Sequence, residues 1–181
     1  MSLQRKLLKS ELTAELDSIL KYWSERTIDD QNGGFVGQID FNDHIIANAE
    51  KGSVLNARIL WTFSASYQTT KNENHKKLAK RAFEFLAANF YDTQFGGLFW
   101  SINEDKTPKD TKNQIYALAF AIYGLSEYYV ISQDQKALEI AINLYKSIQK
   151  YSYDPVNKGY LEAFTRDWQP IEDLRLSDKD A

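Results

Sequence analysis

The sequence predicts an all-α fold in which outer and inner helices alternate around a common axis, an (α/α) toroid. Two observations support this prediction. A glycine-containing turn recurs at nearly equal intervals, marked by Gly34, Gly97 and Gly159, and the helical segments between the turns alternate between amphipathic and almost uncharged. Such self-similarity indicates a repeated structural unit, and a helix without a polar face is buried on all sides. An open helical solenoid is the alternative, but it does not require uncharged inner helices.

The repeated turns divide the chain into comparable units. Each turn follows a helical pattern and precedes a short alternating run, which predicts a helix end, a glycine turn and then a small hairpin. Hairpins therefore connect outer to inner helices, and short polar loops near 71–74 and 132–134 connect inner to outer helices. The three turns are Asp30–Gly37, Asp92–Trp100 and Asp154–Leu161.

Three amphipathic helices are expected in the outer layer. Their apolar residues recur at helical spacing with Lys, Arg and Glu on the opposite side, so each helix has one buried and one solvated face. The three apolar stripes are Leu12, Leu16, Ile19, Leu20 and Trp23; Ala79, Phe83, Leu86 and Phe90; and Leu138, Ala141, Ile142, Tyr145 and Ile148.

Two nearly uncharged helices are expected in the inner layer. Ser53–Thr70 contains only Arg58 as a charged residue, and Asn113–Ser126 contains none. Placing Leu60 on Leu118 superposes the two segments and makes Arg58 equivalent to Tyr116.

The number of helices indicates that the ring is not complete. A closed toroid of this kind, (α/α)6, has six helix pairs, so we expect this chain to be an incomplete N-terminal portion. Because soluble monomers avoid large apolar surfaces, a further C-terminal part or a second copy is expected to cover the inner helices, with the tail 174–181 as a linker.

Length and composition favour a single domain over residues 1–181. The chain has 22 Lys and Arg against 25 Asp and Glu, a net charge of −3, which argues against a nucleic-acid partner. No stretch approaches the ~20 apolar residues of a membrane span. The chain has no cysteine, which excludes thiol catalysis and zinc–thiolate sites. We expect a cytoplasmic location because the first residues carry no apolar signal-peptide core.

The equivalent positions on the two inner helices predict a pocket at the axis of the toroid. Hydrogen-bonding groups combined with aromatic rings suit a neutral polyhydroxy ligand such as a sugar. Trp100 and Trp168 either stack on sugar rings as well or pack beneath the hairpins. The residues expected at the axis are Arg58, Tyr116, Asn56, Gln114, Trp61 and Phe120.

Arg58 is the candidate catalytic residue. A charge on an otherwise apolar helix is costly without a partner. Arg58 therefore either pairs with a loop carboxylate, such as Asp110 or Glu162, or stabilises a substrate oxygen that becomes negative during a reaction. For Tyr116 the alternative to a ligand contact is ordinary core packing.

The remaining polar residues indicate no metal site. The two histidines, His44 and His75, are far apart in the sequence and fit no metal spacing. We expect His75 to be solvated and His44 to lie in a surface loop. A glycosidase pair could be drawn from Asp30, Asp40 and Asp43 on the hairpin side, but no spacing singles one out.

The segment Lys51–Ser64, KGSVLNARILWTFS, resembles the second helix of the N-acylglucosamine 2-epimerase and cellobiose 2-epimerase family. The resemblance runs from about Leu12 to Ser177 and implies an (α/α)6 barrel. It also implies a cofactor-free epimerase that acts at C2 of a mono- or disaccharide with a free reducing end. Further segments that resemble the cellobiose 2-epimerase branch, in the same order, are Asp30–Gly37, Phe95–Trp100, Asp110–Tyr123 and Gly159–Trp168.

The resemblance also implies a mechanism. In the family the sugar ring opens, a histidine removes the C2 proton to give a cis-enediolate, and a second histidine returns a proton to the other face, as suits a side chain that titrates near neutral pH. Arg58 matches the family arginine that contacts the sugar oxygens, and Tyr116 matches a tyrosine of the sugar pocket.

Neither His44 nor His75 matches the family's catalytic histidines, which belong to later helices. We therefore expect those histidines to lie beyond Ala181 and this chain to be inactive alone. The alternatives are a glycoside hydrolase on the same fold, or a non-catalytic sugar-binding or self-associating helical module.

Overall fold

The computed structural model describes residues 3–172, and the tail expected to be a linker lies outside them. The single domain over residues 1–181 stays a prediction. The helices are α1 (Leu3–Arg26), α2 (Ser53–Thr70), α3 (Glu73–Asn89), α4 (Ile115–Ser132) and α5 (Gln135–Ser147), which continues as a π-helical turn, Ile148–Ser152. The strands are β1 (Lys51–Gly52), β2 (Ser101–Ile102), β3 (Pro108–Asp110), β4 (Asn113–Gln114), β5 (Tyr153–Asp154), β6 (Gly159–Tyr160) and β7 (Ala163–Phe164).

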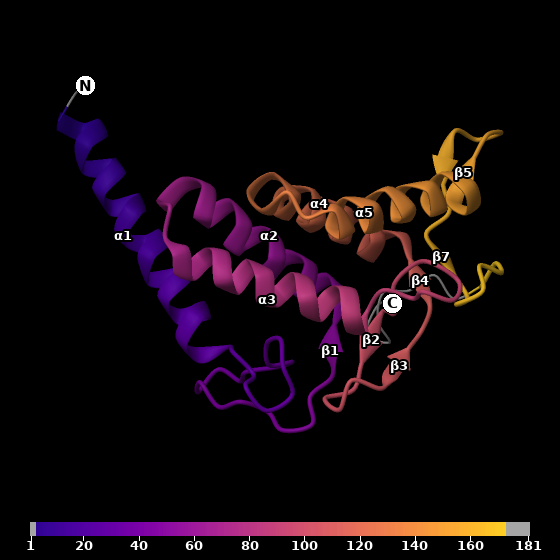
Figure 1. Cartoon of the computed structure of the whole chain (residues 1–181), viewed down its shortest axis with the longest axis horizontal. Helices are drawn as coiled ribbons and strands as arrows, with labels where there is room; N and C mark the ends of the chain where they lie inside the picture. The colour runs from indigo at the N-terminus through magenta and orange to yellow at the C-terminus, as the bar shows by residue number, and fades with distance from the viewer. Residues whose placement is uncertain (1–2, 173–181) are drawn as a thin grey trace.

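The helices form the predicted layers. Inner helices α2 and α4 lie side by side, α3 packs on α2, and α5 packs on α4, while α1 lies at the edge of the assembly (Figure 1). By length and composition α4 is apolar enough to cross a membrane, but here it is an inner helix between α2 and α5. The alternation of outer and inner helices read from the sequence is confirmed.

The two inner helices approach each other closely at Gly124 of α4. A Cβ atom on Gly124 would lie 2.6 Å from the carbonyl oxygen of Ala57 and 3.5 Å from the Cβ of Leu60, both on α2. Only a residue without a side chain fits this contact, because real Cβ atoms do not approach a carbonyl oxygen so closely. Gly124 therefore sets the spacing of the inner layer.

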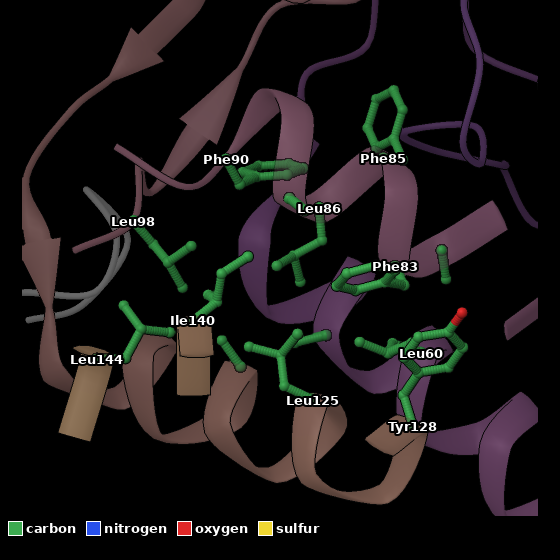
Figure 2. Packing of buried hydrophobic residues seen from close by; sticks show 14 of the residues in the cluster. Leu60, Phe83, Phe85, Leu86, Phe90, Leu98, Leu125, Tyr128, Ile140 and Leu144 are labelled. Atoms are coloured by element: carbon green, nitrogen blue, oxygen red, sulfur yellow. The ribbon is translucent and has the colours of Figure 1, made fainter. Parts of the chain in front are cut away.

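The hydrophobic core lies between the two layers. Leu60 and Leu125 of the inner helices meet Phe83 and Leu86 of α3 and Ile140 of α5 (Figure 2). Phe83 also stacks on Tyr128, with ring centroids 4.7 Å apart. Burial of this continuous apolar surface is the dominant stabilising contribution to such a fold.

The outer helices bury their predicted stripes to different extents. All four stripe residues of α3 are buried, as predicted. In α1 only Leu20 is fully buried, Leu16 and Trp23 are half-buried, and Leu12 is 62% exposed. Helix α5 buries its Ala141 side, whereas two of its predicted stripe residues, Ile142 and Tyr145, are exposed. Helix α1, at the edge of the assembly, is thus the outer helix whose predicted stripe the rest of the chain buries least.

The recurring turns share one hydrogen-bonding pattern. Each begins with an aspartate whose Oδ1 accepts the backbone N–H groups two and three residues later, which is an Asx turn. In the first two turns a basic side chain binds the other carboxylate oxygen: Lys51 Nζ lies 2.7 Å from Asp29, and Arg166 Nε lies 2.6 Å from Asp92. The three aspartates are Asp29, Asp92 and Asp154, so the first turn begins one residue before the predicted Asp30.

Short antiparallel strands connect successive hairpins. Strands β1, β2 and β3 form one small sheet, with Lys51 opposite Ile102, and β4 pairs with β7, with Gln114 opposite Ala163. Strands β5 and β6 form the third hairpin. The predicted sequence of helix end, glycine turn and hairpin is confirmed, and these strands fix where each inner helix begins.

The register that relates the two inner helices differs from the predicted one. Both helices have 18 residues, they begin at Ser53 and Ile115, and both end at a residue in the left-handed conformation. In this register Arg58 corresponds to Phe120, and Trp61 corresponds to Tyr123. The predicted superposition of Arg58 on Tyr116 was therefore wrong by about one helical turn. A shift of one turn keeps a residue on the same face of the helix but moves it along the helix axis.

In this chain the inner helices are not buried on all sides, which agrees with the expectation of an incomplete ring whose inner helices need a further cover. Each carries one stripe that α3 and α5 do not cover, because the outer helices pack on the opposite side. We call this surface the open face. Its exposed and half-buried residues are Val54, Arg58, Trp61, Ala65 and Gln68 of α2, and Tyr116, Ala119, Phe120, Tyr123, Glu127 and Val130 of α4.

His75 is buried, which corrects the prediction that it is solvated. It is 8% exposed, its Nδ1 lies 2.9 Å from Thr70 Oγ1, and its ring lies 6.1 Å from that of Phe63. Burial lowers the pKa of His75, and the charge of Asp17 opposes this effect only in part. The sequence around His75 is rich in Lys and Asn, which hid its position on the inward side of α3.

The depressed pKa of His75 predicts a pH-dependent stability. The unfolded chain takes up this proton near pH 6.5 and the folded chain only at lower pH, so the free energy of unfolding falls as the pH drops below about 6.5. Urea unfolding at about pH 7 and about pH 5 should show this loss, and His75→Gln should reduce it. His44→Gln, in an exposed loop, is the control, and an unchanged pH dependence in His75→Gln would contradict the assignment.

Candidate functional site

The open face brings together most of the residues predicted to line the axis. Arg58 and Trp61 are one helical turn apart on α2, and Tyr116, Phe120 and Tyr123 follow one another at the same spacing on α4. Tyr116 is 43% and Tyr123 48% exposed. One continuous surface therefore presents a guanidinium group and several aromatic rings.

Contacts between α2 and α4 hold this surface together. Trp61 stacks on Tyr123 with ring centroids 5.0 Å apart and an interplanar angle of 16°. Gln68, about two turns beyond Trp61 on α2, donates a hydrogen bond to Glu127, which lies about one turn beyond Tyr123 on α4. Such contacts fix two neighbouring helices relative to each other, and an aromatic pair contributes about 0.5–1.5 kcal/mol beyond its burial.

Arg58 is exposed and has no hydrogen bond or ion pair with any residue in the part of the chain that the structure describes. The two carboxylates expected as alternative partners bind elsewhere: Asp110 lies 3.4 Å from Lys112 Nζ, and Glu162 accepts a hydrogen bond from the backbone N–H of Tyr116. The ion-pair interpretation of Arg58 was therefore wrong for these two residues. Its guanidinium group keeps all its donors available for an oxygen ligand.

A groove of about 260 Å³ lies beside Arg58, between α1 and α2. Its other lining residues are mostly apolar, so Arg58 is the charged group in an otherwise hydrophobic groove. A ligand there would meet hydrogen-bond donors on one side and hydrophobic contacts on the other. The apolar lining residues are Ile19, Trp23, Leu55, Ile59 and Phe63.

Asn56 and Gln114 lie below the open face rather than on it. Their exposed fractions are 1% and 0%. Asn56 Nδ2 donates a 2.8 Å hydrogen bond to the carbonyl of Gly52, and Gln114 belongs to β4, opposite Ala163. The structure thus does not bring these two amides together with Arg58 and Tyr116, and their contact with a sugar stays a prediction.

A second groove, of about 430 Å³, lies at the N-terminal end of α2 beneath the hairpins. Trp100, Gln38 and Glu50 line it. A hydrogen bond from Lys109 is the largest influence on Glu50 and, against the effect of burial, lowers the pKa of its carboxyl group. The groove is polar on one side and carries the half-buried Trp100 on the other.

The two remaining tryptophans differ in role. Trp100 lines this second groove, so stacking on a ligand stays open to it. Trp168 is 5% exposed, stacks on Tyr151 with centroids 4.5 Å apart, and donates a hydrogen bond to the carbonyl of Phe95. For Trp168 the packing alternative is confirmed.

The hairpin carboxylates and histidines do not form a catalytic group. The backbone N–H of His44 donates to Asp40, and this bond is the largest influence that lowers the Asp40 pKa, the opposite of what a glycosidase acid needs. Asp43 accepts a hydrogen bond from Tyr22, and Asp30 lies 3.3 Å from Arg81. Among the described residues no group of three or more His, Cys, Asp or Glu side chains could hold a metal ion.

Comparison with known proteins places the chain in a family. The family model for N-acylglucosamine 2-epimerase (GlcNAc 2-epimerase) matches residues 33–177. The chain belongs to this family. A cellobiose 2-epimerase of Bacteroides fragilis is 49% identical over 176 residues, which cover 97% of this chain and 45% of that protein. The chain therefore spans less than half the length of this relative.

Solved structures give the same result for the fold. A cellobiose 2-epimerase from Bacillus thermoamylovorans superposes with a TM-score of 0.89 at 36% identity, covering 92% of this chain and 43% of that one. A family 76 glycoside hydrolase from a bovine Bacteroides thetaiotaomicron strain matches with a TM-score of 0.69 at 18% identity, covering 91% and 32%, and shows the fold alone. The described residues form part of an (α/α)6 toroid.

Tyr123 was missing from the residues predicted for the site. It follows Trp61 at the same interval that separates Gly97 from Gly159 in successive glycine turns. Superposing the two inner helices at the spacing of the glycine turns would have identified Tyr123, whereas the predicted register paired Trp61 with a different residue. The equivalence explains why Trp61 and Tyr123 occupy matching positions and stack on each other.

The stack between Trp61 and Tyr123 predicts a measurable coupling. In a double-mutant cycle with Trp61→Ala and Tyr123→Ala, the free energies of unfolding should be non-additive by about 0.5–1.5 kcal/mol. The control cycle pairs Trp61→Ala with Tyr145→Ala on the outer surface of α5, and it should be additive within about 0.5 kcal/mol. Additivity in both cycles would show that the rings do not interact.

Proposed function

We propose that this chain forms the N-terminal part of a carbohydrate 2-epimerase of the cellobiose 2-epimerase type. Its proposed substrate is a mono- or disaccharide with a free reducing end. The observation that supports this most is Arg58, a guanidinium group without an internal partner among the described residues, beside the aromatic rings of the open face. The family and the relatives, which are themselves named cellobiose 2-epimerases, support the same reaction.

Arg58 suits the charged intermediate of this reaction. Removal of the C2 proton from the open-chain sugar moves an electron pair toward the C1 carbonyl, and the oxygens of the resulting enediolate carry negative charge. A guanidinium group fixed nearby stabilises this charge more than that of the neutral sugar, and so lowers the barrier. Return of a proton to the opposite face of C2 completes the epimerisation.

The aromatic residues suit the uncharged parts of the sugar. Trp61, Tyr116 and Phe120 share the open face with Arg58. Phe120 meets the ring of Tyr116 edge-on, with centroids 4.9 Å apart. In the proposed site these rings contact the C–H surfaces of the sugar, and the Tyr116 hydroxyl supplies a hydrogen bond.

The groups that transfer protons are proposed to come from outside this region. His75 is buried at the α2–α3 connection, at the end of α2 away from the hairpins, and His44 lies in an exposed loop bonded to Asp40. Neither is placed beside Arg58. We therefore propose that the remaining part of the toroid supplies the acid and base. A cytoplasmic location, and the absence of nucleic-acid and membrane partners, stay predictions.

The decisive experiment joins this chain to the remainder of the Bacteroides fragilis relative. In deuterated water the joined protein should epimerise cellobiose and introduce deuterium at C2, as followed by NMR. Arg58→Ala should lower kcat/KM by about 10²–10³, whereas Arg26→Ala on α1 should leave it unchanged. The 181-residue chain alone should show no exchange.

Other outcomes would overturn the proposal. A folded joined protein without exchange, or with full activity in Arg58→Ala, would contradict the role of this face. Release of reducing sugar from an oligosaccharide, abolished by substitution of Asp30, Asp40 or Asp43, would instead favour a glycoside hydrolase. Exchange at an enzymatic rate by the chain alone would contradict the assignment of proton transfer to another part of the toroid.

A further inference from the structure

The second groove, at the N-terminal end of α2, continues into the open face. Val54 and Leu55 line it. Val54 also belongs to the open face, and Leu55 also lines the groove beside Arg58. Val54 lies one helical turn before Arg58, about 6 Å along the helix axis. A ligand that begins at Arg58 and is longer than one sugar ring therefore reaches the second groove when it runs toward the hairpins.

The repeat of the fold fixes the position of Trp100 relative to α2. The backbone N–H of Ser53, the first residue of α2, donates a 3.0 Å hydrogen bond to the carbonyl of Trp100. At the start of α4, the backbone N–H of Ile115 donates a 2.9 Å hydrogen bond to the carbonyl of Glu162. Trp100 and Glu162 are separated by the interval between the second and third glycine turns. They are therefore equivalent residues, and each lies across the first turn of an inner helix.

The side chain at this repeated position lies beside the open face. The Glu162 carboxylate accepts a 3.2 Å hydrogen bond from the backbone N–H of Tyr116, which belongs to the open face. Tyr116 corresponds to Val54 in the register of the inner helices, and Trp100 and Val54 both line the second groove. Trp100 thus presents its half-buried indole ring at the hairpin end of the open face.

The groups around Trp100 suit a neutral sugar ring. Lys112 Nζ lies over the indole, 5.6 Å from its centroid, and this attraction helps to orient the ring. On the polar side of the groove, Glu50 Oε2 lies 2.9 Å from Lys109 Nζ and accepts a 3.1 Å hydrogen bond from the Ser101 hydroxyl. Glu50 Oε1 accepts no hydrogen bond from any residue in the described part of the chain. The carboxylate is therefore held in place with one oxygen available for a hydroxyl group of a ligand.

We propose that Trp100 is a specificity-determining residue, which selects disaccharides over monosaccharides by stacking on the second sugar ring. Glu50 Oε1 accepts a hydrogen bond from a hydroxyl group of the same ring. This role of Trp100 rests on the proposed function, because Arg58 has to hold the first ring. The second groove, of about 430 Å³, falls within the range of about 300–1,000 Å³ that is usual for small-molecule sites. An aromatic ring beside fixed polar groups matches a ligand with C–H surfaces and hydroxyl groups.

Calorimetric titration of the joined protein with cellobiitol and glucitol tests the proposal. These alditols of cellobiose and glucose have no carbonyl group, so they bind without reacting, and they differ by the second ring. Trp100→Ala should weaken cellobiitol binding about tenfold, because it removes the stacking surface, and should leave glucitol binding unchanged within about twofold. Trp100→Phe, which keeps an aromatic ring, should restore the cellobiitol affinity to within about threefold of the original. Glu50→Gln should weaken cellobiitol binding about threefold, because an amide oxygen is a weaker acceptor than a carboxylate.

Phe41→Ala is the matched control. Phe41 is 97% exposed, lies in the first hairpin and does not line the second groove, so its removal should change neither affinity. Trp100→Ala keeps the backbone carbonyl that binds Ser53, and circular dichroism checks that each variant is folded. With cellobiose as substrate, Trp100→Ala should raise KM about tenfold and leave kcat unchanged, a pattern that a general loss of structure does not produce.

Three results would overturn the role of Trp100: an unchanged cellobiitol affinity in Trp100→Ala, an equal loss of affinity for both alditols, or no cellobiitol binding by the joined protein. The proposed function is tested separately by deuterium exchange. Cellobiitol binding that depends on Trp100, without exchange into cellobiose, would support the second-ring site and contradict the epimerase. Exchange into cellobiose with a KM that Trp100→Ala does not change would support the epimerase and contradict the role of Trp100.

Discussion

The close contact between α2 and α4 at Gly124 determines the arrangement of the rest of the molecule. With no side chain at this position, the backbone of Ala57 and the side chain of Leu60 come within van der Waals distance of α4. Helices packed this closely bury their facing sides against each other, and α3 and α5 then cover the side that holds Leu60 and Leu125 (Figure 2). The opposite side is left as the open face.

This arrangement links the fold to the proposed chemistry. The Trp61–Tyr123 stack exists only because α2 and α4 are held at this spacing. Arg58 lies one turn from that stack, so its level relative to the aromatic rings follows from the same contact. The hairpin turns fix the N-terminal end of α2. There Lys51, which is 1% exposed, forms a buried ion pair with Asp29 just before the helix begins.

Much of the fold could be predicted from the sequence because it repeats. The glycine turns, the apolar stripe of α3 and the low charge of the inner helices all indicated alternating layers. The exact register between the inner helices could not be predicted in the same way, since a slip of about one helical turn keeps an apolar helix on the same face. The glycine turns cannot be shifted in this way. Their spacing gives the correct register of the two inner helices, in which Trp61 corresponds to Tyr123.

The candidate site was predictable in its residue types and less so in its details. Arg58 stood out as a lone charge, and Tyr116 and Trp61 lie with it on the open face. Asn56 and Gln114 are buried because they precede or begin the inner helices, where strands and backbone carbonyls surround them. Local sequence cannot reveal such coverage, because it depends on hairpins from distant parts of the chain.

Substitution of Gly124 by alanine tests the central contact most directly, because two effects predict opposite signs. In an uncrowded helix Gly→Ala raises the free energy of unfolding by about 0.5–1 kcal/mol. Here the added Cβ would overlap the carbonyl of Ala57, so urea unfolding of Gly124→Ala should show a loss of about 1–3 kcal/mol. A gain in stability would contradict the close packing of α2 and α4 on which the open face depends.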